Sequence, residues 1–343
     1  MVDSTSMWTR IRSHHLFWPL MALALIMLFN LIFTPGFFKL EIKDGHLFGS
    51  LIDILNRGAP LMLLAIGMTM VIATAGVDLS VGAVIAICAA VAARLIGNET
   101  GITATPLILV ILISLGVAIL CGIWNGLLVS RGNIQPMVAT LVLMVAGRGI
   151  AQLITDGQIL TIYYEPYYFI GGGYLFGLPF SLYIVAGVFL FAWLLSKRTA
   201  IGLFVESVGT NDSSSFYSGI SEKNIKLFVY VFCALCAGIA GLVISSNIKS
   251  ADANNAGLLA ELDAILAVVI GGTLMSGGRF YLGGSVIGAI IVQSMTTTIY
   301  ALGVPAEVAY VVKALVVLVV VLLYSEMVKV AMDRIFTRKE TQT

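Results

Sequence analysis

The chain has 343 residues, of which 59% are apolar and only 11% are charged, and its net charge is +1 at pH 7. Water-soluble domains normally carry about 25% charged residues, so this composition excludes an ordinary soluble enzyme or binding domain. The net charge gives no reason to expect a nucleic-acid partner. The apolar residues form long blocks near the roughly 20 residues that cross a bilayer, which is typical of a polytopic membrane protein.

The apolar blocks predict ten helical spans. In chain order they are Phe17–Phe33, Ala59–Thr74, Val81–Ile96, Pro106–Val129, Pro136–Ile154, Pro179–Leu195, Ile225–Ser246, Asp263–Leu274, Leu282–Tyr300 and Val308–Tyr324. The second, third and eighth blocks are short for a full crossing. We therefore expect an all-α membrane protein with one transmembrane domain over residues 1–343.

Ten spans would place both termini on the same side of the membrane. With the termini in the cytoplasm, twelve Lys and Arg residues fall in inner segments and five in outer segments, which the positive-inside rule favours. The five outer residues are Lys39, Lys43, Arg57, Arg94 and Lys249. Residues 1–16 and 325–343 are then cytoplasmic tails, and residues 197–224 form the longest cytoplasmic loop.

No motif for bond chemistry is present in the sequence. A Gly-Lys dipeptide is absent, which excludes a phosphate-binding loop ending in Gly-Lys-Ser/Thr, and no His-Glu-x-x-His occurs. Cys233 and Cys236 have redox or metal spacing, but they lie in an apolar block where small residues pack helices together. We expect no enzyme activity, no metal and no cofactor, so that any ATPase would be another chain.

Polar groups inside the spans predict a permeation path, because an ionisable side chain at bilayer depth costs about 2.5–3.5 kcal/mol and must face protein or water. Arg148, Gln152 and Asp156 are spaced by four and share one helix face. They predict a polar stripe, although Arg148 could instead extend outward and pair with Asp156. Asn125 lies in a Gly-x-x-x-Gly pattern, where a buried amide more often bonds to a neighbouring helix than to a substrate.

Two glycine-rich segments, Ala75–Gly82 and Gly271–Arg279, interrupt apolar sequence. Paired interruptions can mark a substrate path in transporters, although both segments could equally be tight inner turns. The first contains Asp78. Asp263 begins the eighth span, where a negative charge interacts favourably with the positive end of the helix dipole. It also follows residues 250–257, whose hydrogen-bonding groups suit a polyhydroxylated ligand.

The cytoplasmic loop 197–224 contains a candidate short helix. Asn211 or Asp212 can cap its beginning, and Gly219 marks its end. Such a helix on the membrane surface could dock a partner, or the segment could be an ordinary surface loop.

The chain resembles the ribose-type sugar permeases of bacterial ABC importers, and within that family the branch that imports galactofuranose. The residues that carry the family resemblance are Gly67–Gly82, Pro136–Leu141, Gly147–Gly149, Glu261–Gly272 and Gly277–Arg279, and those that carry the branch are Asp44–Ser50, Ile52–Arg57 and Ala251–Gly257. The resemblance implies the ABC importer permease fold in the inner membrane of a Gram-negative cell. It also implies three partners: a second, related permease, a tandem-domain cytoplasmic ATPase and a periplasmic sugar-binding protein.

The family's coupling segment reads Gly-x-Asn, then two alanines, then Gly-Ile or Gly-Val. Gly209, Asn211 and Gly219 fit this pattern, and Asp212 follows the asparagine. Ser214 and Ser215 stand at the alanine positions, where serine is a poorer helix former by several tenths of a kcal/mol.

We therefore expect one half of the pore of an ATP-driven sugar importer, with galactofuranose or a related furanose or pentose as substrate. The expected path passes Asp78, Asn125, Arg148, Gln152 and Asp263. The alternative is an ion-coupled secondary sugar transporter, a design that usually places carboxylates or broken helices at the midplane.

Overall fold

The computed structural model describes residues 16–43, 45–97 and 105–305, together with residues 308, 311–315 and 318. The chain divides into two units, Met1–Ser294 and Met295–Thr343. The first unit carries the features described below. Most of the predicted span Val308–Tyr324 lies outside the described residues.

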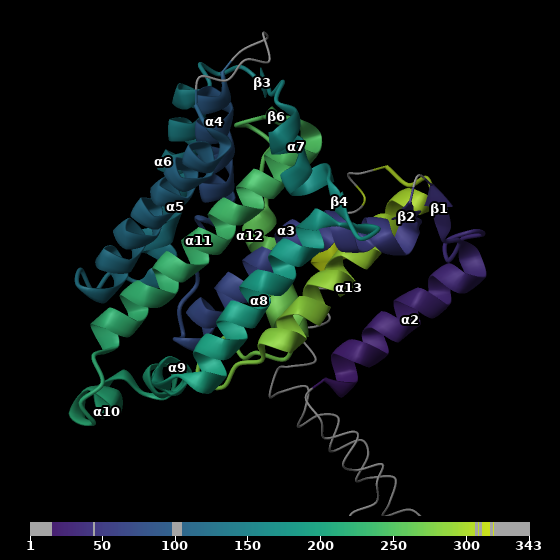
Figure 1. The fold of residues 1–343 in the computed structure, drawn as a ribbon. Helices are drawn as coiled ribbons and strands as arrows, with labels where there is room; N and C mark the ends of the chain where they lie inside the picture. The colour runs from purple at the N-terminus through teal and green to yellow at the C-terminus, as the bar shows by residue number, and fades with distance from the viewer. Residues whose placement is uncertain are drawn as a thin grey trace, which may run out of the picture. The chain divides into compact units, whose positions relative to one another are not determined.

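The described residues are mostly helical (Figure 1). The helices are α2 (Phe17–Phe33), α3 (Ser50–Ala73), α4 (Val81–Ile96), α5 (Leu107–Ser130), α6 (Pro136–Ile154), α7 (Glu165–Gly172), α8 (Phe180–Arg198), α9 (Ala200–Thr210), α10 (Asp212–Tyr217), α11 (Glu222–Ile248), α12 (Ala260–Ile270) and α13 (Leu282–Ala301). Three pairs of short antiparallel strands connect them: β1 (Glu41–Lys43) with β2 (His46–Phe48), β3 (Leu160–Thr161) with β6 (Ser250–Ala251), and β4 (Tyr174–Leu175) with β5 (Leu178–Pro179).

Six of these helices are long and apolar enough to cross a membrane: α3, α5, α6, α8, α11 and α13. Helices α2 and α4 are apolar but shorter, at 17 and 16 residues. The predicted all-α membrane fold is thus confirmed in outline.

The predicted spans Phe17–Phe33, Val81–Ile96 and Pro136–Ile154 coincide with α2, α4 and α6. The second span was predicted to begin at Ala59, but α3 begins at Ser50. The first turns of α3 hold polar residues that interrupt the apolar block, and hydropathy alone therefore placed its beginning too late.

Helix α4 packs against α5, α6 and α11. Nearly all of its side chains are buried, as expected for a helix that is apolar on every side. Sixteen residues span about 24 Å, which is less than the roughly 30 Å hydrocarbon core of a bilayer. We call the end of the first unit at which α4 begins the Ser80 end, and the opposite end the Ile96 end.

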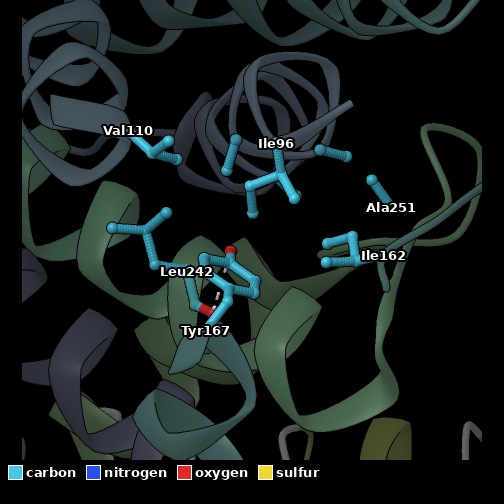
Figure 2. Close-up of a cluster of buried hydrophobic side chains, with 9 residues drawn as sticks. Ile96, Val110, Ile162, Tyr167, Leu242 and Ala251 are labelled. Atoms are coloured by element: carbon cyan, nitrogen blue, oxygen red, sulfur yellow. Dashed lines mark hydrogen bonds between the residues drawn. The ribbon is translucent and has the colours of Figure 1, made fainter. Parts of the chain in front are cut away.

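A buried apolar cluster closes the Ile96 end. It joins Ile96 of α4, Val110 of α5, Tyr167 of α7 and Leu242 of α11 with Ala251 of β6 (Figure 2). The Tyr167 hydroxyl lies 2.6 Å from Ser245 Oγ and donates to the carbonyl oxygen of Leu242 at 3.4 Å. This cluster fixes the position at which β6 enters the unit.

Two Gly-x-x-x-Gly patterns, the one that contains Asn125 and a second at Gly284 and Gly288, are sites of close helix packing. A methyl group added to Gly122 of α5 would stand 2.6 Å from the Cα atom of Val231 in α11, and one added to Gly126 would stand 3.1 Å from that of Leu227. Methyl groups added to Gly284 and Gly288 of α13 would overlap the carbonyl oxygens of Gly271, directly after α12, and of Ala267 within it. Glycine is needed at these crossings because the two backbones touch.

Candidate functional site

The chain between Ser250 and Leu259 runs along α4 with its alanines buried and with Asn254, Asn255, Leu258 and Leu259 exposed, and we call it the re-entrant segment. At its start, Ala251 pairs with Leu160 of β3 and belongs to the same buried cluster as Ala89, Ala92, Ala93 and Ile96 of α4. Towards its end, Gly257 lies against Gly82 of α4, where an added methyl group would stand 2.8 Å from the Gly82 carbonyl oxygen. The cluster residue of α4 nearest to Gly82 is Ala89, seven positions further along the helix, which is an axial distance of about 10 Å.

The course of the re-entrant segment along α4 explains why the eighth predicted span is short. Helix α12 begins at Ala260, beside the first turn of α4, and ends at Ile270. It is therefore a half-helix whose beginning lies inside the unit. Irregular backbone at such a depth needs hydrogen-bond partners from protein or from a polar cavity.

Arg148 supplies those partners. Its Nη1 atom donates to the carbonyl oxygen of Ala256 at 2.6 Å and to that of Ala253 at 3.1 Å. One turn further along α6, Gln152 Nε2 donates to Asn254 Oδ1 at 2.6 Å. The predicted polar stripe on α6 is thus a clamp on the re-entrant segment.

Asp156 does not continue this helix face as predicted, because α6 ends at Ile154 and Asp156 has a positive φ of +53°. Asp156 pairs with Arg94 of α4, with an Nη1–Oδ2 distance of 3.3 Å, rather than with Arg148. Both side chains of that pair are largely exposed, and exposed pairs contribute little to stability.

Asp252 orders the first turn of the re-entrant segment. Its Oδ1 atom accepts the backbone N–H groups of Asn254 and Asn255 at 2.9 and 3.2 Å, and its Oδ2 atom accepts from Asn255 Nδ2 at 2.7 Å. The hydrogen bond from the Asn255 side chain is the main reason that the pKa of Asp252 lies below its usual value. Asn254 and Asn255 remain exposed. Together with Gln152 they present an amide-rich surface that can hydrogen-bond a neutral polyol.

Asp78 and Asn125 form a separate, fully buried cluster at the Ser80 end. Asp78 Oδ1 accepts from the Ser80 backbone N–H at 2.9 Å and from its hydroxyl at 2.7 Å, and Asn125 Nδ2 donates to Ser80 Oγ at 2.8 Å. Thr140 of α6 accepts the backbone N–H of Leu79 at 3.1 Å. In this conformation these side chains hold the loop Thr74–Ser80, which we call the first break, against α5 and α6.

Asp263 lies half-buried on the first turn of α12, and its role on a path stays a prediction. Glu261, two residues before Asp263, is only 4% exposed and was not among the predicted path residues. Gly82 leaves room for it, since an added methyl group would stand 2.6 Å from Glu261 Oε2. The positive charge of Arg148 acts on both Glu261 and Asp252. The contact with Gly82 and its deeper burial set Glu261 apart from Asp263, and no sequence pattern reveals that contact.

The loop 197–224 forms two helices, of which only the second was predicted. Asn211 caps α10, since its Oδ1 atom accepts the Ser214 backbone N–H at 2.9 Å, and Gly219 follows the helix at a positive φ of +83°. Helix α10 therefore forms with serines at the alanine positions, and Ser215 is buried. Asp212 pairs with Lys226, which ties α10 to the beginning of α11.

Two aromatic side chains on α10 were missed by the sequence analysis. Phe216 and Tyr217 are 64% and 88% exposed and pack edge to face on each other. Adjacent exposed aromatics in a polar loop are the signal that could have found them, because such residues are enriched at protein interfaces.

The described residues contain no group of three or more His, Cys, Asp and Glu side chains that could hold a metal ion. All four cysteines are free thiols; Cys88, Cys233 and Cys236 are buried and Cys121 is half-buried. Cys233 and Cys236 face Gly67 of α3, so this pair packs a helix crossing.

Comparison with known proteins gives the class of this chain. Residues 50–321 match the family described as the permease component of the branched-chain amino acid transport system, and the chain belongs to this permease family. No solved structure matches.

Its curated relatives include sugar permeases. The chain is 50% identical over 314 residues to the galactofuranose transporter permease protein YtfT of Escherichia coli K12, covering 90% of this chain and 91% of that one. It is 38% identical to the fructose import permease FruF of Bifidobacterium longum, with 91% and 88% covered, and 36% identical to the ribose import permease RbsC of Haemophilus influenzae, with 88% and 90% covered. The chain is thus a sugar permease of the ABC importer class, a membrane protein and not an enzyme.

Proposed function

We propose that this chain is one half of the translocation pore of an ATP-driven importer for galactofuranose or a related furanose or pentose. The similarity to the galactofuranose permease over nearly the whole chain supports the substrate. The observation that carries the proposal is the re-entrant segment, whose exposed Asn254 and Asn255 are held in place by Arg148.

The surface around the re-entrant segment supports the half-pore role. Leu141 and Val145 continue the face of α6 that bears Arg148 and Gln152, and both apolar side chains are exposed in the single chain. A stripe that is polar at one end and apolar at the other fits a seam with a second permease better than it fits lipid. The sugar would then pass between the two permeases.

The proposed topology has ten spans with both termini in the cytoplasm, which places the Ser80 end and α10 on the cytoplasmic side. The coupling loop 197–224 would bind a tandem-domain ATPase through α10, and a periplasmic sugar-binding protein would deliver substrate at the Ile96 end. The membrane would be the bacterial inner membrane. In this arrangement, while the path is closed, Asp78 and Asn125 stabilise the first break and do not line the path.

Uptake by proteoliposomes tests the proposal. The chain is reconstituted with the second permease, the ATPase and the binding protein, and uptake of galactofuranose, ribose and fructose is compared. We expect ATP-dependent accumulation that is lost with a hydrolysis-deficient ATPase. Uptake that persists with that ATPase but collapses when an uncoupler is added would instead favour an ion-coupled transporter, for which the buried Asp78 and Glu261 would be the candidate carboxylates.

A further inference from the structure

Three segments that are far apart in the sequence meet at the Ser80 end: the end of α3, the end of α9 and the loop Gly271–Tyr281, which we call the second break. The Gly278 backbone N–H donates a hydrogen bond of 2.9 Å to the carbonyl oxygen of Ala73. Gly209 of α9 lies against both groups. A methyl group added to it would overlap the Ala73 carbonyl oxygen and stand 2.6 Å from Gly278 N.

The second break needs glycine here for conformation as well as for space. Gly277 and Gly278 have φ of +82° and +91°, a region that other residues rarely adopt. A methyl group on Gly277 would stand 2.8 Å from Ala75 N and 2.8 Å from the Gly209 carbonyl oxygen. We call Ala73, Gly209, Gly277 and Gly278 the glycine junction.

Contacts at the glycine junction join backbone to backbone. The backbone groups of these segments are in direct contact, with the Thr210 side chain beside Gly278, and close-packed groups transmit strain. Movement of the end of α9 by a fraction of an ångström therefore has to move the first break and the second break together. The first break leads into α4, and the second leads into the beginning of α13.

Space for such a movement lies beside the junction. A cavity of about 430 Å³ opens there between the first break, the ends of α9 and α5, and the beginning of α11. Its lining includes Gly76, Gly209, Asn211 and Tyr230. Asn211 is also the cap of α10. Gly209 therefore lies only two residues before the cap of the helix that carries the exposed aromatic side chains.

We infer that the glycine junction is the point at which a displacement of α10 reaches both breaks at once, and that Gly209 is a positioning residue for transport. The inference rests on the proposed function, in which the partner ATPase binds α10. It adds that the two breaks move as one body, so that a single docking helix controls the beginnings of α4 and α13.

Gly209→Ala tests this in the complete importer. We expect the variant to assemble with the ATPase and to hydrolyse ATP, while the number of sugars taken up per ATP falls at least tenfold. Gly171→Ala is the matched control, because its methyl group would overlap the carbonyl oxygen of Val243 at the Ile96 end. The control should lose comparable thermal stability and keep the wild-type ratio. A normal ratio in Gly209→Ala, or an equal loss in Gly171→Ala, would overturn the inference.

A second measurement uses the wild-type importer, so it decides the matter even if Gly209→Ala fails to fold. Hydrogen exchange is followed with and without a non-hydrolysable ATP analogue. We expect the protection of amides in the first break and in the second break, including that of Gly278, to change together with the protection of amides in α10. A change confined to residues 211–218 would contradict the inference. Absence of ATP-dependent uptake by the wild-type importer would refute the proposed function instead.

Discussion

Replacing Arg148 with methionine should release the re-entrant segment. Methionine keeps a long apolar side chain but removes both hydrogen bonds to the carbonyl oxygens of Ala253 and Ala256. A hydrogen bond to a charged group contributes about 1.5–3 kcal/mol when buried. Arg148 is only half-buried and water can replace part of the interaction, so we expect a loss of about 2 kcal/mol for the pair.

A loss of about 2 kcal/mol corresponds to an increase of about 30-fold in the population of the displaced segment. Hydrogen exchange measures this population directly. The backbone N–H groups of Ala256 and Leu258 donate to the carbonyl oxygens of Asp252 and Asn255 at 2.9 and 3.1 Å, and their exchange should accelerate by that factor. The maximal uptake rate should fall several-fold in proteoliposomes while binding of the ATPase is unchanged.

The control is Arg94→Met, which removes a cation at the same end of the first unit. Its exposed pair with Asp156 contributes about 0–1 kcal/mol, so exchange in the re-entrant segment should stay at the wild-type rate. Wild-type exchange and uptake in Arg148→Met would refute the clamp, because the two hydrogen bonds would then hold nothing in place.

Three further predictions concern the cap of α10, the Ile96 end and pH. Asn211→Ala removes the cap and should destabilise α10 by about 1 kcal/mol, seen as weaker co-purification of the ATPase. Tyr167→Phe loses the hydroxyl contact with Ser245 and should lower the unfolding free energy by about 1 kcal/mol, with an unchanged uptake rate. Asp252 has a lowered pKa, so its stabilisation is complete above the unfolded value of about 3.9 and is lost as pH falls through the lower folded pKa. The protection factor of the amides in the re-entrant segment, which is the exchange rate corrected for intrinsic exchange at each pH, should therefore be constant from about pH 5 to 8.

Each of these predictions has a clear contrary outcome. Asn211→Ser retains a capping oxygen and should behave like the wild type, so equal losses in both variants would mean that the cap is not the cause. A fall in uptake by Tyr167→Phe at unchanged stability would place Tyr167 in transport rather than in packing. A protection factor that falls between pH 8 and pH 5 would show that another group controls the segment.

The helices could be predicted where apolar sequence and local boundaries agree. Helix α6 has Pro136 in its first turn, and α4 ends at Gly97 with φ of +74°, so both ends are encoded in nearby residues. Helix α9 was not predicted, because Ala200–Thr210 mixes polar and apolar residues within a loop.

The candidate site could be predicted only in part. The spacing of Arg148 and Gln152 identified one helix face, and the cap at Asn211 identified α10. The depth of the re-entrant segment depends instead on the fit of Gly257 against Gly82, which are 175 positions apart and share no local signal. The glycine junction depends in the same way on contacts between distant residues.

The thiol distribution makes this permease convenient for site-directed labelling. Its native sulfhydryl groups are enclosed among helices, and only Cys121 is partly accessible in the single chain. A membrane-impermeant maleimide should therefore react slowly with the wild type. A new cysteine at Asn254 or Tyr217 would report, over a low background, which face of the bilayer each position meets during the cycle.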